Sequence, residues 1–420
     1  IRQQLQTELS AARSGRPVGI ERVELGLSRA GNALELRAVG VTVEDGRGGV
    51  LSRSREARIE LGVLPLLVGR IVLVRAEFSG GEITFTLKPD GAVHVAFGPE
   101  GAPPDIIVRP PPPNETLEQR VNRILDAMES AFRPIGAGGG LRALSVREAK
   151  LAIIDEAGGG RWTADAAHLE LARQGGSLAL IADARLEGAQ GLAPASLRIT
   201  TDTQFQSAII EFGAENVRPR ALLSPTALGP FAGLDAPLTA TISIGLDRRT
   251  GINRFEGEAV IGRGAAEMPG GRFDLDGGRV HGRYDIASDE LIFDELALDG
   301  ARTRINGEVR VRDASAILRA APDQPAAFNI ALPSMTLDVP GTFSEPISFS
   351  NVQAVGAIVA AERSIRFTSL HAETGQGVIN LAGRVYWAAA GADQRLRPGI
   401  ELQGEVSGEL SVREVLRGWP

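Results

Sequence analysis

The stretch that decides the fold is IELQGEVSGELSV, residues 400–412, near the end of the chain. Every second residue, beginning with Ile400, is apolar or glycine, and the residues between them are charged or polar. A side-chain period of two indicates a β-strand with one buried and one solvated face. The apolar side carries two glycines, Gly404 and Gly408, where a packed core would have large side chains.

One short pattern recurs along the second half of the chain: an apolar residue, any residue, Gly, then Glu or Arg, then a further apolar or small residue. Its copies are FEGEA (255–259), VHGRY (280–284), INGEV (305–309), LAGRV (381–385) and LQGEV (402–406), with glycines at Gly257, Gly282, Gly307, Gly383 and Gly404. The first two gaps are 25 residues, which fits two strands and two turns of an up-and-down antiparallel sheet.

Composition narrows the class of protein. The chain has 420 residues and a formal net charge of -7, which gives no basic footprint for nucleic acid. It has no cysteine, so disulfides, iron–sulfur clusters and thiolate chemistry are excluded. Glycine (51) and proline (24) are frequent and aromatic residues make up only 5%, as in chains of many short strands separated by turns.

The pattern predicts three segments. Residues 1–97 form a β module with a short N-terminal helix, residues 98–140 a proline-rich connector with an amphipathic helix near 114–133, and residues 141–420 a β-repeat that continues past the end of the chain. Thr116 and Gln119 have the spacing of a capping box at the start of the second helix.

The predicted fold is mainly β: an elongated, curved antiparallel sheet whose apolar face must be covered by something. Either the glycines only permit curvature of a sheet that fills its own core, or the sheet is an open hydrophobic groove (a β-taco) that receives acyl chains. The candidate groove-lining residues are Ile242, Ile244, Leu246, Phe255, Phe273, Tyr284, Ile305, Val309, Ile379, Leu381, Val385, Leu402 and Val406.

The helix near 114–133 has two interpretations of its own. Its apolar stripe either caps the end of a sheet and fills core, or it plugs the groove. The stripe consists of Leu117, Val121, Ile124, Leu125, Met128 and Phe132.

No catalytic or metal-binding pattern is present. The four histidines, His94, His168, His281 and His371, are far apart, and no two have the spacing of metal ligands. The chain contains no GxSxG, HExxH or GxxxxGK[ST] sequence. We therefore expect neither an enzyme nor a cofactor.

The first hundred residues resemble the start of AsmA-like envelope proteins. The resemblance lies in GRPVGIERVEL (15–25), GVTVEDGRGGVL (40–51) and ARIELGVLPLLVGRIVLVRAEFSGGEITFTLKPDGAVHV (57–95). The C-terminal half is similar to the YhdP/TamB-type branch, with long β-repeats and a Leu-x-x-Trp-Pro ending at 416–420. The proline-rich connector and residues 207–235 match nothing in that family.

The resemblance implies a bridge-like lipid transfer protein. Such proteins are anchored to the inner membrane by an N-terminal helix, reside in the periplasm of Gram-negative bacteria, and are thought to carry phospholipid to the outer membrane through a hydrophobic β groove. This chain would then lack its anchor and its distal part, and phospholipid acyl chains and outer-membrane or envelope proteins would be its partners.

Two other classes of function stay open. One is a non-transport envelope scaffold that assists outer-membrane protein assembly, with its apolar face filled by its own side chains. The other is a secreted β-repeat adhesin or glycan binder, which would usually display aromatic platforms, whereas the chain has only three tryptophans.

Overall fold

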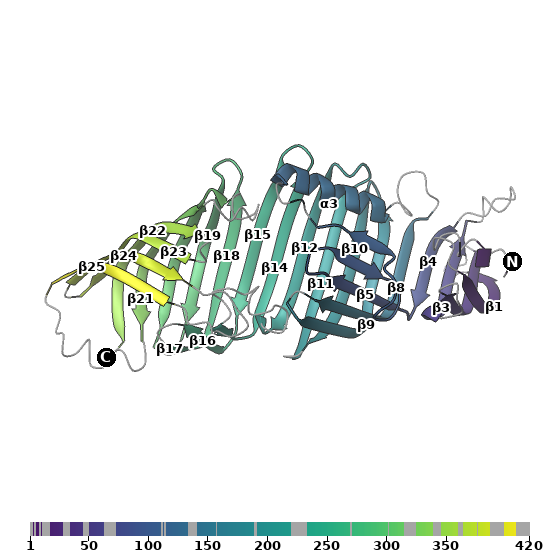
Figure 1. Cartoon of the computed structure of the whole chain (residues 1–420), viewed down its shortest axis with the longest axis horizontal. Helices are drawn as coiled ribbons and strands as arrows, with labels where there is room; N and C mark the ends of the chain where they lie inside the picture. Colours follow the sequence, from purple (N-terminus) through teal and green to yellow (C-terminus); the bar gives the residue numbers. More distant parts are fainter. Residues whose placement is uncertain are drawn as a thin grey trace. The chain divides into compact units, whose positions relative to one another are not determined.

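The structure, a computed structural model, describes residues 3, 6–7, 10, 17–27, 34–44, 50–62, 73–110, 112, 115–132, 141–156, 158–188, 191–219, 233–268, 271–300, 302–314, 325–338, 346–359, 364–375, 377–386 and 399–408. These residues are mainly β and form an open, mixed sheet of 22 strands and a separate sheet of three (Figure 1). The mainly β fold is confirmed. The expectation of a purely antiparallel sheet is wrong, because one strand pairs in parallel with two others.

The chain divides into two compact units. Unit 1 comprises residues 1–212 and 246–251, and unit 2 comprises residues 213–245 and 252–420. The division of the sequence into 1–97, 98–140 and 141–420 stays a prediction.

Unit 1 contains two antiparallel runs of neighbouring strands, β1 to β4 and β8 to β11. Its strands are β1 (Val18–Leu27), β2 (Leu34–Glu44), β3 (Val50–Leu61), β4 (Leu73–Ser79), β5 (Glu82–Leu87), β6 (Val93–Ala96), β7 (Ile106–Val108), β8 (Ala143–Asp155), β9 (Gly160–Gln174), β10 (Ser177–Gly188), β11 (Gly191–Asp202) and β12 (Ser207–Val217), of which residues 213–217 belong to unit 2.

The parallel pairing comes from a bend between β4 and β5. Both strands pair in parallel with β8, β4 along Ala143–Arg147 and β5 along Lys150–Asp155. Gly80 and Gly81 join them with φ of +79° and +103°, a left-handed conformation that glycine adopts without a Cβ clash. On the other edge, β4 pairs with β3 and β5 with β6, so the sheet branches at this bend.

The helices of unit 1 follow local signals. Helix α3 (Leu117–Phe132) begins with the predicted capping box: Thr116 N–H donates to Gln119 Oε1 at 2.9 Å, and Gln119 N–H donates to Thr116 Oγ1 at 3.2 Å. Near the N-terminus, Gln3, Gln6, Thr7 and Ser10 are helical. The other residues of the short helix expected there lie outside the described ranges.

Unit 2 continues with antiparallel neighbours from β18 to β25. Its strands are β13 (Leu234–Asp235), β14 (Leu238–Asp247, with its last two residues in unit 1), β15 (Gly251–Ile261, with Gly251 in unit 1), β16 (Gly264–Met268), β17 (Gly271–Leu275), β18 (Gly277–Asp285), β19 (Glu290–Asp299), β20 (Arg304–Arg312), β21 (Ala326–Leu337), β22 (Ile347–Val359), β23 (Ser364–Thr374), β24 (Gly377–Tyr386) and β25 (Gly399–Gly408).

The repeat glycines are spaced less regularly in the sheet than in the sequence. Gly257 in β15 lies directly opposite Gly282 in β18, because β16 and β17 leave the large sheet and pair with β13 in the small one. By contrast, β19 lies between the strands of Gly282 and Gly307. The expected partner strand is therefore present between Gly282 and Gly307. It is missing between Gly257 and Gly282, and also between Gly383 and Gly404, whose strands β24 and β25 are direct neighbours.

Large and small residues alternate along one row of this sheet. From β20 to β25 the register aligns Val311, Phe328, Gly356, Phe367, Gly383 and Leu402. The rings of Phe328 and Phe367 meet edge to face, 5.5 Å apart and at 80°, although β22 runs between their strands. A methyl group at Gly356 would lie 2.0 Å from the carbonyl oxygen of Arg366 in the neighbouring strand and 2.6 Å from Phe328 Cζ. Glycine at this position therefore avoids a clash with the backbone of β23 and also leaves room for the two rings to meet across the intervening strand.

We predict that Gly356→Ala lowers the free energy of unfolding by about 1–3 kcal/mol, the usual cost of overpacking a core. The matched control is Gly257→Ala, where the nearest atom to an added methyl group lies 3.7 Å away. That change should leave stability unchanged or raise it by up to about 1 kcal/mol, since alanine loses less backbone entropy in a strand. Urea unfolding of the two variants checks this, and equal effects would contradict the role given to Gly356.

Candidate functional site

The candidate site is one apolar face of the sheet in unit 2. Two hydrophobic clusters lie on it, the first around Val311, Phe328 and Ala354, and the second around Leu332 and Val352. All members of both clusters, core and partly buried, come from β19 to β24, which are successive neighbours in the sheet. Among the described residues, these clusters therefore contain no side chain from a second layer.

Many large side chains on this face are only partly buried. They include Leu291, Phe293, Val309, Ile330, Ile358, Ile365, Phe367 and Leu370, which pack against the first cluster. Because they touch their neighbours sideways and lack a covering layer in the described part of the chain, they form a continuous apolar strip. A strip of this kind is a candidate surface for an apolar ligand or partner.

The register places most predicted lining residues on this same face. Ile305 and Ile379 pack against the second cluster and Val309 against the first. Gly257, Gly282, Gly307, Gly383 and Gly404 share the face, since their register partners continue it from strand to strand. Leu402 and Val406 belong to β25, opposite Gly383 and Ile379, and their side chains are outside the described ones.

The remaining predicted lining residues lie in several places. Ile242 and Ile244 alternate with polar residues in β14, and Leu246, in the same strand, belongs to unit 1 and is buried. Phe255, Tyr284, Leu381 and Val385 are partly buried in β15, β18 and β24. Phe273 lies in β17 of the small sheet and is buried there, away from the strip.

Three of the five repeat glycines, Gly282, Gly307 and Gly404, lie close to atoms of the neighbouring strand, whereas Gly257 has room beside it for a Cβ. An added methyl group would lie 2.8 Å from Phe293 Cδ1 at Gly282, 2.6 Å from Leu332 Cδ2 at Gly307 and 2.8 Å from Leu381 Cδ2 at Gly404. At Gly307 and Gly404 the neighbouring backbone is closer still, with the carbonyl oxygens of Ala331 and Asn380 at 2.3 and 2.1 Å, so at these three positions the adjoining strand and its large side chain leave no room for a Cβ. These three glycines therefore allow close approach between neighbouring strands of the sheet.

The opposite face of these strands is charged. His281 Nδ1 lies 2.5 Å from Asp294 Oδ1, and Arg283 Nε lies 3.4 Å from Asp294 Oδ2. Arg279 lies 3.7 Å from Glu258 and 3.9 Å from Glu295. The two faces of the sheet in unit 2 therefore differ: one carries the apolar strip, and the other carries a solvated network of ion pairs.

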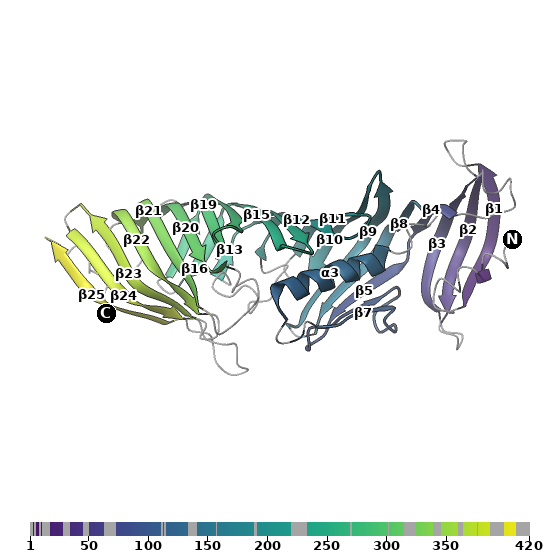
Figure 2. The same ribbon diagram turned by 90° about the horizontal axis from the view of Figure 1, so that it is seen from above.

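In unit 1, helix α3 covers apolar side chains. Val121, Leu125, Met128 and Phe132 of the predicted stripe are buried, and Ile124 is partly buried. The side chain of Leu117 lies outside the described ones. The Phe132 ring meets that of Phe205 edge to face at 5.9 Å. In both views the helix runs across the direction of the strands (Figures 1 and 2).

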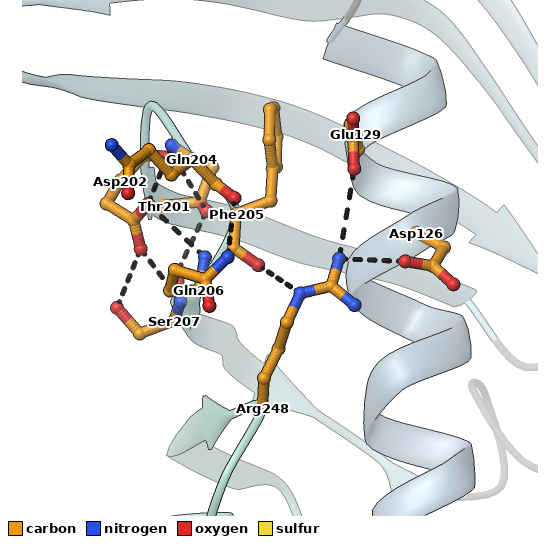
Figure 3. A network of polar contacts seen from close by, with 9 residues as sticks. All are labelled: Asp126, Glu129, Thr201, Asp202, Gln204, Phe205, Gln206, Ser207 and Arg248. Carbon is orange, nitrogen blue, oxygen red and sulfur yellow. Dashed lines mark hydrogen bonds and ion pairs between the residues drawn. The ribbon is translucent and has the colours of Figure 1, made fainter.

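A polar network holds α3 to two hairpin turns (Figure 3). Arg248 follows β14, and its Nε donates to the carbonyl oxygen of Phe205 at 2.8 Å. The same guanidinium contacts Asp126 at 2.7 Å and Glu129 at 3.8 Å on the helix. Asp202 organises the second turn, accepting hydrogen bonds from the backbone N–H groups of Gln204, Gln206 and Ser207. These N–H donors lower the pKa of Asp202 against the effect of its burial.

The sequence reasoning missed the centre of the strip. Phe328, Gly356, Phe367 and Leu370 contribute to it, but none belongs to a copy of the glycine pattern. The available signal was the period-two alternation of SFSNVQAVGAIV (348–359) and SIRFTSL (364–370), the partner strands of the repeat.

Comparison with known proteins identifies no relative: no family model, no curated protein and no solved structure matches the chain. Within the described ranges, no helix is long and apolar enough to span a membrane. The same ranges contain no group of three or more histidine and acidic side chains placed to hold a metal ion. Two parts of the sequence that resemble AsmA-like proteins lie outside the described residues. They are residues 66–72 and the Trp419-Pro420 ending.

We predict that the stability of unit 2 falls as the pH rises above about 6.5, the usual histidine value. The hydrogen bond to Asp294 raises the pKa of His281, and Glu256 adds to the effect. Because the folded-state pKa is the higher one, this stabilisation is fully present below the unfolded pKa and is lost as the pH rises through the folded pKa. His281→Gln should flatten the pH dependence of the unfolding free energy, leaving the part due to His371, whose pKa is also raised by Asn380 and Glu373. An unchanged slope in the variant would contradict this assignment.

Proposed function

We propose that the apolar strip of unit 2 is the floor of an open groove for phospholipid acyl chains, and that the chain conducts lipid between the inner and outer membranes of a Gram-negative envelope. The observation that carries the proposal is the strip itself: large, partly buried apolar side chains from β19 to β24 with no second layer among the described residues. The periplasmic location and the inner-membrane anchor rest on the resemblance to AsmA-like proteins alone.

The physical chemistry of the strip suits an acyl chain. Burial of one methylene group is worth about 0.8 kcal/mol, so a tail lying across several strands gains enough to leave water. An acyl chain needs no hydrogen bonds, and the strip offers only apolar side chains. The side chains over Gly282, Gly307 and Gly404 keep its surface level, so a tail could slide from one strand to the next.

The alternative is an envelope scaffold that assists outer-membrane protein assembly. One feature of unit 1 favours this alternative. Four apolar side chains of helix α3, Val121, Leu125, Met128 and Phe132, are buried within unit 1 and are therefore not available to lipid. On this alternative a further protein segment would cover the strip of unit 2, and no lipid would bind.

Lipid extraction separates the two proposals. We predict that the chain purified from a Gram-negative host carries phospholipid detectable by mass spectrometry. A Val309→Asp, Leu370→Asp double variant should lower the amount of lipid per chain about tenfold, which corresponds to about 1.4 kcal/mol. Both residues are partly buried members of the strip, and a carboxylate there would have to be desolvated by a bound tail.

The matched control is Val355→Asp. Val355 lies in β22 on the opposite face from Gly356 and is 47% exposed, so its carboxylate stays in water. The control should retain bound lipid, and circular dichroism should show that all variants keep their strand content. Lipid that persists unchanged in the double variant would overturn the groove assignment.

A further inference from the structure

The hairpin of β16 and β17 is an insertion in the large sheet of unit 2. Strands β15 and β18 are direct neighbours, and Ile261 at the end of β15 lies opposite Gly278 in β18. Two strands paired in this way need a loop of only about two to five residues. The chain instead makes a longer excursion over residues 262–277, which contains β16 and β17. The pairing of β15 with β18 therefore does not depend on this hairpin.

The small sheet of β13, β16 and β17 packs against the apolar face of the large sheet (Figure 1). One buried cluster joins the two sheets: Ala236 and Leu275 are 0% and 5% exposed, and Ile261 of β15 is 9% exposed. Leu298 of β19 and Leu238 of β14 pack against the same cluster. At the ends of these three strands, the large sheet therefore has a second layer over its apolar face.

The covered side chains belong to a row that continues into the apolar strip. From β15 to β22 the register aligns Ile261, Gly278, Leu298, Ile305, Met335 and Phe349. Ile305, Met335 and Phe349 pack against the second cluster of the strip and are only partly buried. The small sheet thus covers one end of a row whose other end belongs to the uncovered strip.

Backbone hydrogen bonds fix both ends of the insertion to the large sheet. Gly262 N–H donates to the carbonyl oxygen of Pro237 at 2.7 Å, and Asp276 N–H donates to the carbonyl oxygen of Asp299 at 2.7 Å. Gly300, directly after β19, lies so close to the backbone of β17 that it has no room for a Cβ. Because the hairpin is held at both ends and packed at its base, it has the character of a fixed wall and not of a hinged flap.

The two faces of the small sheet have opposite character. Alternation along β17 places Phe273 and Leu275 on the inner face, and both are buried. Arg272 and Asp274 lie on the outer face, with side chains that are 63% and 81% exposed. A sheet with one apolar and one charged face can cover apolar groups and still present a solvated surface to water.

We propose that the small sheet is a side wall of the acyl groove and narrows it between β15 and β19. This inference rests on the proposed function of the strip. An acyl chain that follows the row from Phe349 toward Leu298 meets the packed small sheet at β19 and has to stop or turn there. Lipid that moves from β20 toward β15 is thereby confined to the opposite ends of the strands, where Phe255 and Tyr284 are partly buried.

Photo-cross-linking to the unaltered side chains tests the wall. The probe is a phosphatidylcholine with a diazirine at the methyl end of one acyl chain, and the cross-links are located to single residues by mass spectrometry. In the unaltered chain we expect cross-links at Ile305, Met335 and Phe349 and none at Ile261 or Leu298, although all five residues share one row.

The main test variant replaces residues 262–277 by Asn-Gly, a favourable two-residue hairpin loop. Strands β15 and β18 can keep their register in this variant, and cross-links should spread to Ile261 and Leu298 with a yield similar to that at Ile305. A second variant, Leu275→Asp, retains the whole chain. Its carboxylate is unfavourable in the buried cluster, so the small sheet should detach and cross-links at Leu298 should appear.

The matched control is Asp274→Asn, which changes the exposed face of the same strand and should leave the cross-linking pattern unchanged. Circular dichroism should show that all variants keep the strand content of the large sheet. Cross-links at Leu298 in the unaltered chain, or cross-links still confined to the strip in both test variants, would overturn the wall and leave the groove standing. Absence of any cross-link to the strip in the unaltered chain would overturn the groove, and the wall with it.

Discussion

The packing of unit 2 depends on the meeting of Phe328 and Phe367 above Gly356. A one-sided sheet has to keep its apolar side chains together without the support of an opposing layer, and sideways contact between neighbours is the means available to it. Edge-to-face rings are worth about 0.5–1.5 kcal/mol beyond the area that they bury. Two rings two strands apart can meet only if the residue between them has no side chain. The same relation, a large residue beside a glycine, recurs at Gly282, Gly307 and Gly404.

The sequence suggested that the glycines permit curvature or leave room for a ligand, whereas in the structure most of them allow neighbouring parts of the sheet to approach closely. On the apolar face of a strand, glycine usually marks curvature or close approach. Here the approaching groups belong to the same sheet: a carbonyl oxygen of the neighbouring strand at Gly307, Gly356 and Gly404, and the Phe293 ring at Gly282. The polar face needs no such arrangement, since its arginines, glutamates and histidines reach water or each other. The two faces thus differ in how they are stabilised, one by contact between carbon atoms and the other by exposed ion pairs of small individual worth.

Much of the architecture follows from side-chain periodicity. The alternation from Ile400 onward, the capping box at Thr116 and the stripe from Val121 to Phe132 are local patterns, and the structure has the corresponding strand and helix. The parallel pairing of β8 has no local signal, because it depends on two left-handed glycines meeting a strand about 65 residues further along the chain. Likewise, the sequence does not reveal that β16 and β17 leave the large sheet, because the number of residues between Gly257 and Gly282 is the same in either arrangement.

The central claim is that the strip of unit 2 is open to lipid, and the cysteine-free chain makes this directly measurable. A nitroxide label on a single cysteine at position 370, in the strip, can be compared with one at position 355, on the charged face. In samples that contain phospholipid, a paramagnetic relaxation agent attached to the acyl chain should shorten the relaxation time of the nitroxide at position 370. The relaxation time of the nitroxide at position 355 should not change. A label at 370 that neither this agent nor a water-soluble one can reach would show that protein covers the strip, and would contradict the account.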